Sequence, residues 1–195
     1  MDLRSTIDNI RIDIERYLLI ETGTVTPALS SMIIGIAFGF GLQAVIVHRI
    51  GSYLKDCRYP FFIRKFLGAL HWCLRIWVIQ CYGIQIDRDA SIGKGFYIGH
   101  LSGIYIGRCS IGKICSVHQQ TRIEDNVVVG DNVWIGGHSV IKAGVTIEDD
   151  VTISSGSSVT GDIKKGSLVM GNPLRVVMSR FDNSSLLVKK ANVRI

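Results

Sequence analysis

Residues 111–159 read IGKICS VHQQTR IEDNVV VGDNVW IGGHSV IKAGVT IEDDVT ISSGSS V in blocks of six, and every block opens with isoleucine or valine. The same spacing occurs earlier, before a one-residue slip near Gly107, at Ile86, Ile92, Ile98 and Ile104. A six-residue period is typical of a parallel β-helix, whereas a 3.6-residue helical turn would scatter these side chains around its surface. The pattern therefore predicts a mainly β fold, a hexapeptide β-solenoid over residues 84–170.

Three helical regions are expected before the solenoid. Residues 1–20 predict an amphipathic helix, with arginine and aspartate opposite an apolar face of Leu3, Ile7, Ile10, Ile14, Tyr17 and Leu18. A break at 22–27 leads to a second helical region over 27–55, and a third spans 61–82 and stops at Gly83. We expect residues 1–83 to form an α-helical N-terminal domain that caps the solenoid edge, and residues 171–195 to form a partly disordered tail.

Composition limits the possible functions. The 195-residue chain is 47% hydrophobic, 19% charged and carries a net charge of +6. Its longest apolar run, 32–47, is shorter than the roughly 20 residues that cross a bilayer, so we expect a buried helix, with attachment to a membrane surface as the alternative. No signal-peptide pattern opens the chain, which favours a cytoplasmic protein, peripheral at the inner membrane in that alternative. The basic residues are scattered, so no nucleic-acid partner is expected.

Few residues offer chemistry. The cysteines fit reduced thiols and no metal framework: Cys57, Cys73, Cys81, Cys109 and Cys115. His100 is the first candidate, because an imidazole can take a hydroxyl proton near pH 7, although its position also suits a turn histidine. His118 and His138 are expected to be structural, and His48 and His71 are expected to be core-edge or solvent residues of the helical region. Asp-Asn pairs at 125–126 and 131–132 are expected to cap solenoid corners.

Four segments carry a resemblance to a known family: residues 42–51 (LQAVIVHRIG), 92–100 (IGKGFYIGH), 103–107 (GIYIG) and 171–173 (GNP). Together they resemble the serine O-acetyltransferases, a family of hexapeptide-repeat acetyltransferases. Within that family the chain looks most like the shorter members found in bacterial surface-polysaccharide clusters.

The resemblance implies a left-handed β-helix that forms a homotrimer or a dimer of trimers and transfers an acetyl group from acetyl-CoA to a hydroxyl. It implies that His100 is the general base. It also implies that CoA lies between neighbouring solenoids, where Gly137 and Ser155 would admit the pantetheine chain. Lys164, Lys165 and Arg175 would meet its phosphates.

Departures from the family pattern bear on the acceptor. Gly99 stands where those enzymes place an aspartate before the histidine, Arg108 replaces a glutamate, and Gln85 replaces an upstream carboxylate that orients the histidine, a role open to Asp87 or Asp89. A serine ammonium would find little negative charge. We therefore expect a sugar hydroxyl of a bacterial surface polysaccharide or its precursor as the acceptor.

Three alternatives remain open. The first is serine O-acetylation, and the second is N-acetylation of an amino sugar. The third is a non-catalytic scaffold, or a zinc-binding solenoid that uses His100, His118 and His138.

Overall fold

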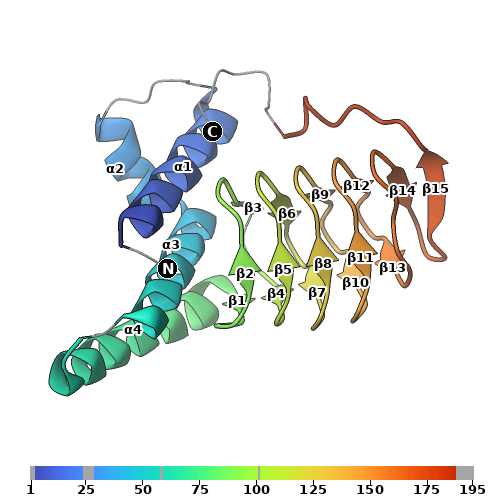
Figure 1. The fold of residues 1–195 in the computed structure, drawn as a ribbon. Coiled ribbons are helices and arrows are strands. Elements are labelled where there is room, and N and C mark those ends of the chain that lie inside the picture. The colour runs from blue at the N-terminus through green and yellow to red at the C-terminus, as the bar shows by residue number, and fades with distance from the viewer. Residues whose placement is uncertain (1–2, 24–28, 58, 101, 188–195) are drawn as a thin grey trace.

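Helices and a β-solenoid follow one another along the chain in the computed structural model, which describes residues 3–23, 29–57, 59–100 and 102–187 (Figure 1). The helices are α1 Leu3–Thr22, α2 Leu29–Phe38, α3 Phe40–Asp56 and α4 Phe61–Tyr82. The strands are β1 Ile84–Ile86, β2 Ser91–Ile92, β3 Tyr97–Gly99, β4 Ile104–Ile106, β5 Ser110–Ile111, β6 Ser116–His118, β7 Arg122–Ile123, β8 Val128–Val129, β9 Trp134–Ile135, β10 Val140–Ile141, β11 Thr146–Ile147, β12 Thr152–Ile153, β13 Ser158–Val159, β14 Leu168–Met170 and β15 Arg175–Met178.

The strands form three sheets that wind around one apolar core. They are a five-stranded sheet (β1-β4-β7-β10-β13), a four-stranded sheet (β11-β8-β5-β2) and a six-stranded sheet (β15-β14-β12-β9-β6-β3). All pairings are parallel except β14 with β15. The residues at the six-residue period stack inside, and Val117, Ile123, Ile135 and Ile141 are fully buried. The predicted parallel β-solenoid is confirmed.

The corners of the solenoid need backbone with positive φ. Asn126, Asn132 and His138 adopt φ values of 59°, 60° and 60° there, a region that asparagine tolerates better than most residues. The preceding aspartates accept hydrogen bonds from the coil below: Asp125 from Arg108 N at 2.8 Å and Asp131 from Lys113 N at 2.7 Å. The predicted structural role of the Asp-Asn pairs is confirmed.

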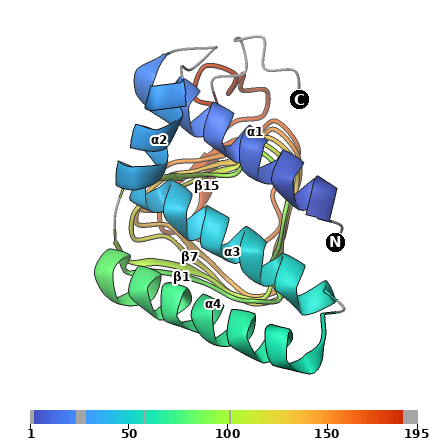
Figure 2. The ribbon, with the colours of Figure 1, turned by 90° about the vertical axis from the view of Figure 1, so that its left-hand side faces the viewer.

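Helices α1, α3 and α4 lie across the N-terminal end of the solenoid, with α3 between the other two (Figure 2). Gly41 allows α3 to sit directly on the first coil, because a Cβ there would lie 2.3 Å from Ile98 O. The helices therefore cover the strand edge that an uncapped solenoid would expose.

The predicted apolar face of α1 is wrong in part. Leu3 and Ile7 are exposed, whereas Asp13 and Arg16 are buried against the solenoid. Asp13 pairs with Arg49 of α3 (Nε–Oδ2 3.0 Å) and accepts from Phe96 N at 2.9 Å. Arg16 donates to Cys115 O at 2.8 Å and to Ser116 Oγ at 2.7 Å. Charged groups on α1 bind backbone of the first coils, a tertiary use that helical periodicity does not reveal.

The second helical region is two helices rather than one. Gly39 separates α2 from α3, and the two axes turn by 90° between 32–38 and 40–56. A Cβ at Gly39 would lie 2.3 Å from Gly35 O, so only glycine fits this elbow. Among the described residues no single helix has the length and apolar character to cross a membrane, although this bent pair meets both criteria together.

Gly83 ends α4 as predicted, with φ 62° and its N–H bonded to Ile79 O at 3.0 Å. The predicted break at 24–27 lies outside the described residues.

The first part of the tail is ordered. After β15 it runs back along the solenoid, where Asn183 Nδ2 donates to Asn132 O at 2.8 Å, and Leu187 is only 1% exposed. Residues 188–195 lie outside the described part. Residues 171–187 are thus ordered, with Asn183 held against coils distant in sequence, and the expected partial disorder of the tail stays a prediction.

Candidate active site

His100 lies at the turn between β3 and β4 with φ 65°. This turn is the first of a column, here called the His100 corner, that joins the six-stranded sheet to the five-stranded sheet. Its described members are residues 100, 102–103, 119–121, 136–139 and 154–157. The column is held by backbone hydrogen bonds from Gln120 N to Ser102 O at 3.0 Å and from His138 N to Gln119 O at 2.8 Å.

A cleft of about 390 Å³ opens beside His100. Its lining residues come from three helices and the first coil: Tyr17 and Glu21 of α1, Phe38 of α2, Phe40 and Gly41 of α3, and Ile98 and His100. The helical cap therefore forms one wall of the cleft, and the solenoid corner forms the other. Three aromatic rings and one carboxylate surround a basic imidazole, a combination suited to binding a polar molecule with some apolar surface.

Among the described residues, Glu21 is the only carboxylate that lines this cleft. Tyr97 OH donates to Glu21 Oε1 at 2.7 Å, and burial with this carboxylate nearby raises the pKa of Tyr97 above its usual value. The hydrogen bond joins the end of α1 to β3, directly before His100. Helix α1 is 76 residues away in sequence, so no local pattern pointed to Glu21.

His118 lies beside Gly99 on the neighbouring strand β6. Its ring packs against Trp134 at 4.8 Å and against Tyr97 at 6.2 Å between centroids. Burial, with a smaller effect of the neighbouring His100, lowers the pKa of His118 to about 4, so the ring is neutral at pH 7. Its Nε2 is buried and has no hydrogen-bond partner within the described part of the chain.

The His118 ring also explains Gly99. A Cβ at position 99 would lie 2.7 Å from His118 Nδ1 and 2.9 Å from Tyr97 Cε1. No side chain fits at Gly99 while His118 holds this position. The glycine at position 99, which departs from the family pattern, is therefore explained by contact with His118. The sequence alone did not connect these two residues.

The expected CoA-binding residues divide into two groups. Gly137 and Ser155 lie at the His100 corner on successive coils, where Gly156 N donates to Gly137 O at 2.8 Å. Arg175 begins β15 just after the turn that follows β14, and Gly171 of that turn bonds Ser157 Oγ at 3.1 Å. These three residues line the same edge of the solenoid as His100.

Lys164 and Lys165 lie at a different corner, between the four- and six-stranded sheets. Lys164 pairs with Glu148 at 2.9 Å, and Lys165 pairs with Asp149 at 3.4 Å. Within one chain they are distant from the His100 corner, because they lie on another edge of the solenoid.

The expected partners of His100 also lie elsewhere. Gln85 sits exposed on β1, in register with Tyr105, and Asp89 pairs with Lys55 and Arg108 at the opposite end of the five-stranded sheet. Neither Gln85, Asp87 nor Asp89 lines the cleft. Among the described residues, no group of three histidine, cysteine or acidic side chains is arranged to hold a metal ion.

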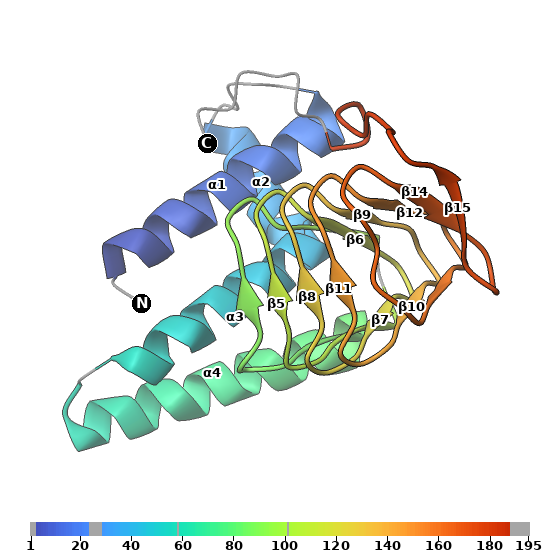
Figure 3. The ribbon, with the colours of Figure 1, turned by 45° about the vertical axis from the view of Figure 1, so that its right-hand side comes forward.

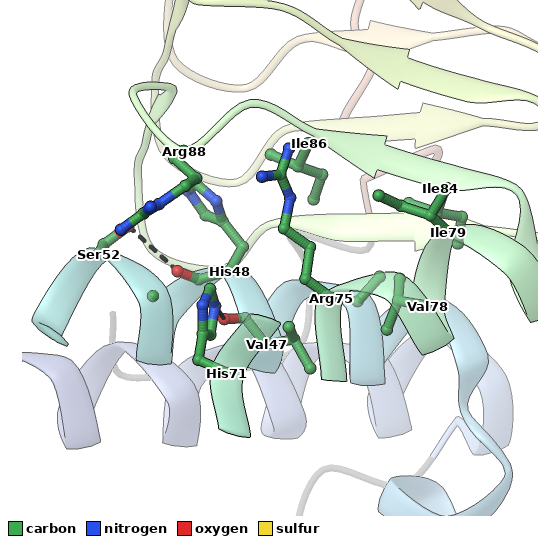
Figure 4. Close-up of a pocket in the computed structure, with 12 residues that line it drawn as sticks. Val47, His48, Ser52, His71, Arg75, Val78, Ile79, Ile84, Ile86 and Arg88 are labelled. Atoms are coloured by element: carbon green, nitrogen blue, oxygen red, sulfur yellow. Dashed lines mark hydrogen bonds between the residues drawn. The ribbon is translucent and has the colours of Figure 1, made fainter. Parts of the chain in front are cut away.

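A second, smaller cavity of about 30 Å³ lies where α3 and α4 meet the first coil (Figure 4). His48, His71, Arg75 and Arg88 surround it, together with apolar side chains. His71 Nε2 lies 3.1 Å from Val47 O, and burial lowers the pKa of His48 to about 4. The cavity has the size of one water molecule, and the expected non-catalytic place of His48 and His71 in the helical region stays a prediction.

Comparisons with known proteins agree with this architecture. The family model described as "Bacterial transferase hexapeptide (six repeats)" matches residues 126–161. The chain therefore has the hexapeptide-repeat acetyltransferase fold.

Its similar relatives are serine acetyltransferases. One from Bacillus licheniformis is 36% identical over 72% of this chain, and one from Synechococcus elongatus is 28% identical over 70%. The chain spans 57% of the length of each of these two relatives.

Solved structures of serine acetyltransferases share the fold. The enzyme from Entamoeba histolytica has a TM-score of 0.68 at 22% identity, with 85% of this chain and 63% of that chain covered. The enzyme from Brucella abortus has a TM-score of 0.64 at 18% identity, with 91% and 71% covered. A serine acetyltransferase in complex with CoA has a TM-score of 0.55 at 20% identity, with 90% and 71% covered.

Proposed function

We propose that this protein is an acetyl-CoA-dependent O-acetyltransferase with His100 as its general base. The observation that carries the proposal is the cleft, which brings an imidazole, a carboxylate and three aromatic rings to one corner of a hexapeptide solenoid. Similarity to serine acetyltransferases, one of them a CoA complex, supports acetyl-CoA as the donor.

His100 can both accept and return the proton that acetyl transfer to a hydroxyl requires. His100 takes the proton of the acceptor hydroxyl, whose oxygen attacks the thioester carbonyl. The tetrahedral intermediate then collapses, the C–S bond breaks, and CoA leaves as its thiol after receiving the proton from His100. The products are the O-acetyl ester and free CoA, and no covalent enzyme intermediate is needed.

Serine is the acceptor that the comparisons support best, since the named relatives are serine acetyltransferases. Glu21 adds a carboxylate to the cleft that can pair with the serine ammonium. Gly99 led to the expectation that a serine ammonium would find little negative charge. Glu21 of α1 can supply that charge in place of the residue before His100.

A neutral sugar hydroxyl is the second candidate. Two observations favour it: His118 prevents any carboxylate at position 99, and the rings of Tyr17, Phe38 and Phe40 offer apolar surface for a pyranose.

The test is thiol release from acetyl-CoA with purified protein, against serine, amino sugars and bacterial surface glycans. Turnover with serine supports the first acceptor, and turnover with a glycan alone supports the second. If no acceptor is acetylated and acetyl-CoA does not bind by calorimetry, the proposed function is wrong.

We propose a homotrimer as the active assembly. If CoA lies between neighbouring solenoids, Lys164 and Lys165 can reach its phosphates only from an adjacent copy, since they are distant from His100 in their own chain. Sedimentation of a stable monomer with full activity would contradict this assembly.

A further inference from the structure

Helix α4 carries a long apolar stripe that the rest of the protein leaves uncovered. The stripe, here called the α4 outer face, consists of Phe62, Phe66, Ala69, Leu70, Cys73 and Trp77, all exposed. Phe62 is 83% exposed, Phe66 70% and Trp77 59%. Apart from the adjacent pair Ala69 and Leu70, successive positions are spaced three or four residues apart, so all of them share one side of the helix.

The opposite side of α4 faces the protein. His71 and Val78 are its only fully buried residues, and a Cβ at Gly51 of α3 would lie 2.5 Å from His71 Nε2. Figures 2 and 3 show α4 at the edge of the molecule, alongside α3 and beyond the end of the solenoid. The α4 outer face therefore points away from both α3 and the solenoid.

The charges on α4 are all of one sign. Arg64, Lys65 and Arg75 are its charged residues, and it has no aspartate or glutamate. Lys65 Nζ lies 5.6 Å from the Phe61 ring centroid, and Arg75 turns toward the solenoid (Figure 4). The cations thus lie beside the α4 outer face and on the side of α4 that faces the protein. Lipid headgroups lie at this level when an interfacial helix is half immersed in a bilayer.

We propose that the α4 outer face inserts into the interfacial region of a bilayer containing anionic lipid and holds the protein at the membrane surface. Large apolar and aromatic side chains on one side with basic residues beside them are the features of an interfacial helix. A second copy fits less well, since two α4 outer faces placed together would bring arginines and lysines to the rim with no carboxylate on either helix. This inference does not depend on the proposed activity.

The test is flotation of the full chain with vesicles of phosphatidylcholine alone or with phosphatidylglycerol. We expect co-flotation with the anionic vesicles and weakening by salt. Phe62→Ser combined with Phe66→Ser should reduce the bound fraction about tenfold. The matched control is Val176→Ser with Val177→Ser, which removes exposed apolar side chains from β15 and should bind like wild type.

Tryptophan emission gives a second readout. Trp72 and Trp77 are exposed on α4, whereas Trp134 lies in the solenoid, so binding should shift the emission of the first two to shorter wavelength. Equal flotation of both double variants, with wild-type circular dichroism, would overturn the proposal. The proposal would also be overturned if the wild-type protein does not bind vesicles and the variant with Phe62→Ser and Phe66→Ser loses an oligomer contact that the wild type makes. The α4 outer face would then bind a second copy.

Discussion

At the residue scale, Glu21 provides the test of serine as the acceptor. If serine binds beside His100, its ammonium is within the cleft that Glu21 lines, and Glu21→Gln should raise the KM for serine about tenfold, or ~1.4 kcal/mol, with little change in kcat. The control is Glu15→Gln, on the same helix but paired with Arg11 at 2.8 Å. An unchanged KM for serine in steady-state assays would show that Glu21 does not bind the acceptor.

Gly99 and His118 form the second residue-scale test. Gly99→Asp alone should lose folding stability, because its Cβ would overlap the His118 ring. Adding His118→Ala makes room and should restore part of the stability, measured by the urea midpoint of each variant. Strict additivity of the two single changes would contradict a direct contact between these positions.

His118 also predicts a pH dependence of stability. Its pKa is about 4 in the folded chain and 6.5 when unfolded, so below pH 6.5 the unfolded state takes up a proton that the folded state does not. Stability contributed by the neutral ring is present above pH 6.5 and is lost as the pH falls toward 4. His118→Phe should therefore lose less stability than wild type between pH 7 and 4.5, as measured by urea unfolding. Equal losses would contradict the lowered pKa.

At the scale of elements, the ion pair of Asp13 with Arg49 joins α1, α3 and the first coil. Both side chains are buried, and Arg49 also donates to Gly93 O at 2.6 Å. Asp13→Ala would leave a buried guanidinium unpaired and should lower the free energy of unfolding by about 3–5 kcal/mol. The exposed pair of Arg11 and Glu15 is the control, where Glu15→Ala should cost less than about 1 kcal/mol. Similar costs would contradict the assigned role.

The solenoid and its corners could be predicted from the sequence, because each coil repeats the same local rule of a buried Ile or Val and a turn with positive φ. The helix α4 and its stop at Gly83 followed from local signals as well. The roles of Asp13, Glu21 and Asn183 could not be predicted, since each contacts a residue at least 50 positions away in sequence. His100 could be predicted as a candidate, but the partner expected to orient it was Gln85, Asp87 or Asp89, and none of these lines the cleft.

At the scale of the whole molecule, the tail closes over the solenoid. Asn183 donates to the carbonyls of Asn132 and Val151, more than 30 residues earlier, and Leu187 N bonds Asn183 O with its side chain only 1% exposed. Leu187→Ala should lower the free energy of unfolding by about 2–5 kcal/mol, as measured by urea unfolding. The neighbouring exposed Leu186→Ala is the control. Equal, small effects would mean that the tail does not stabilise the fold.

The most direct test of the account compares two histidines of the His100 corner. His100→Asn and His138→Asn both place asparagine where φ is positive, 65° and 60°, so neither adds backbone strain. The quantity to measure is kcat for thiol release from acetyl-CoA with the preferred acceptor. We predict that His100→Asn lowers kcat by about 10²–10⁴-fold, whereas His138→Asn leaves it near wild type. Equal activity of His100→Asn and wild type would contradict the assignment of His100 as the base.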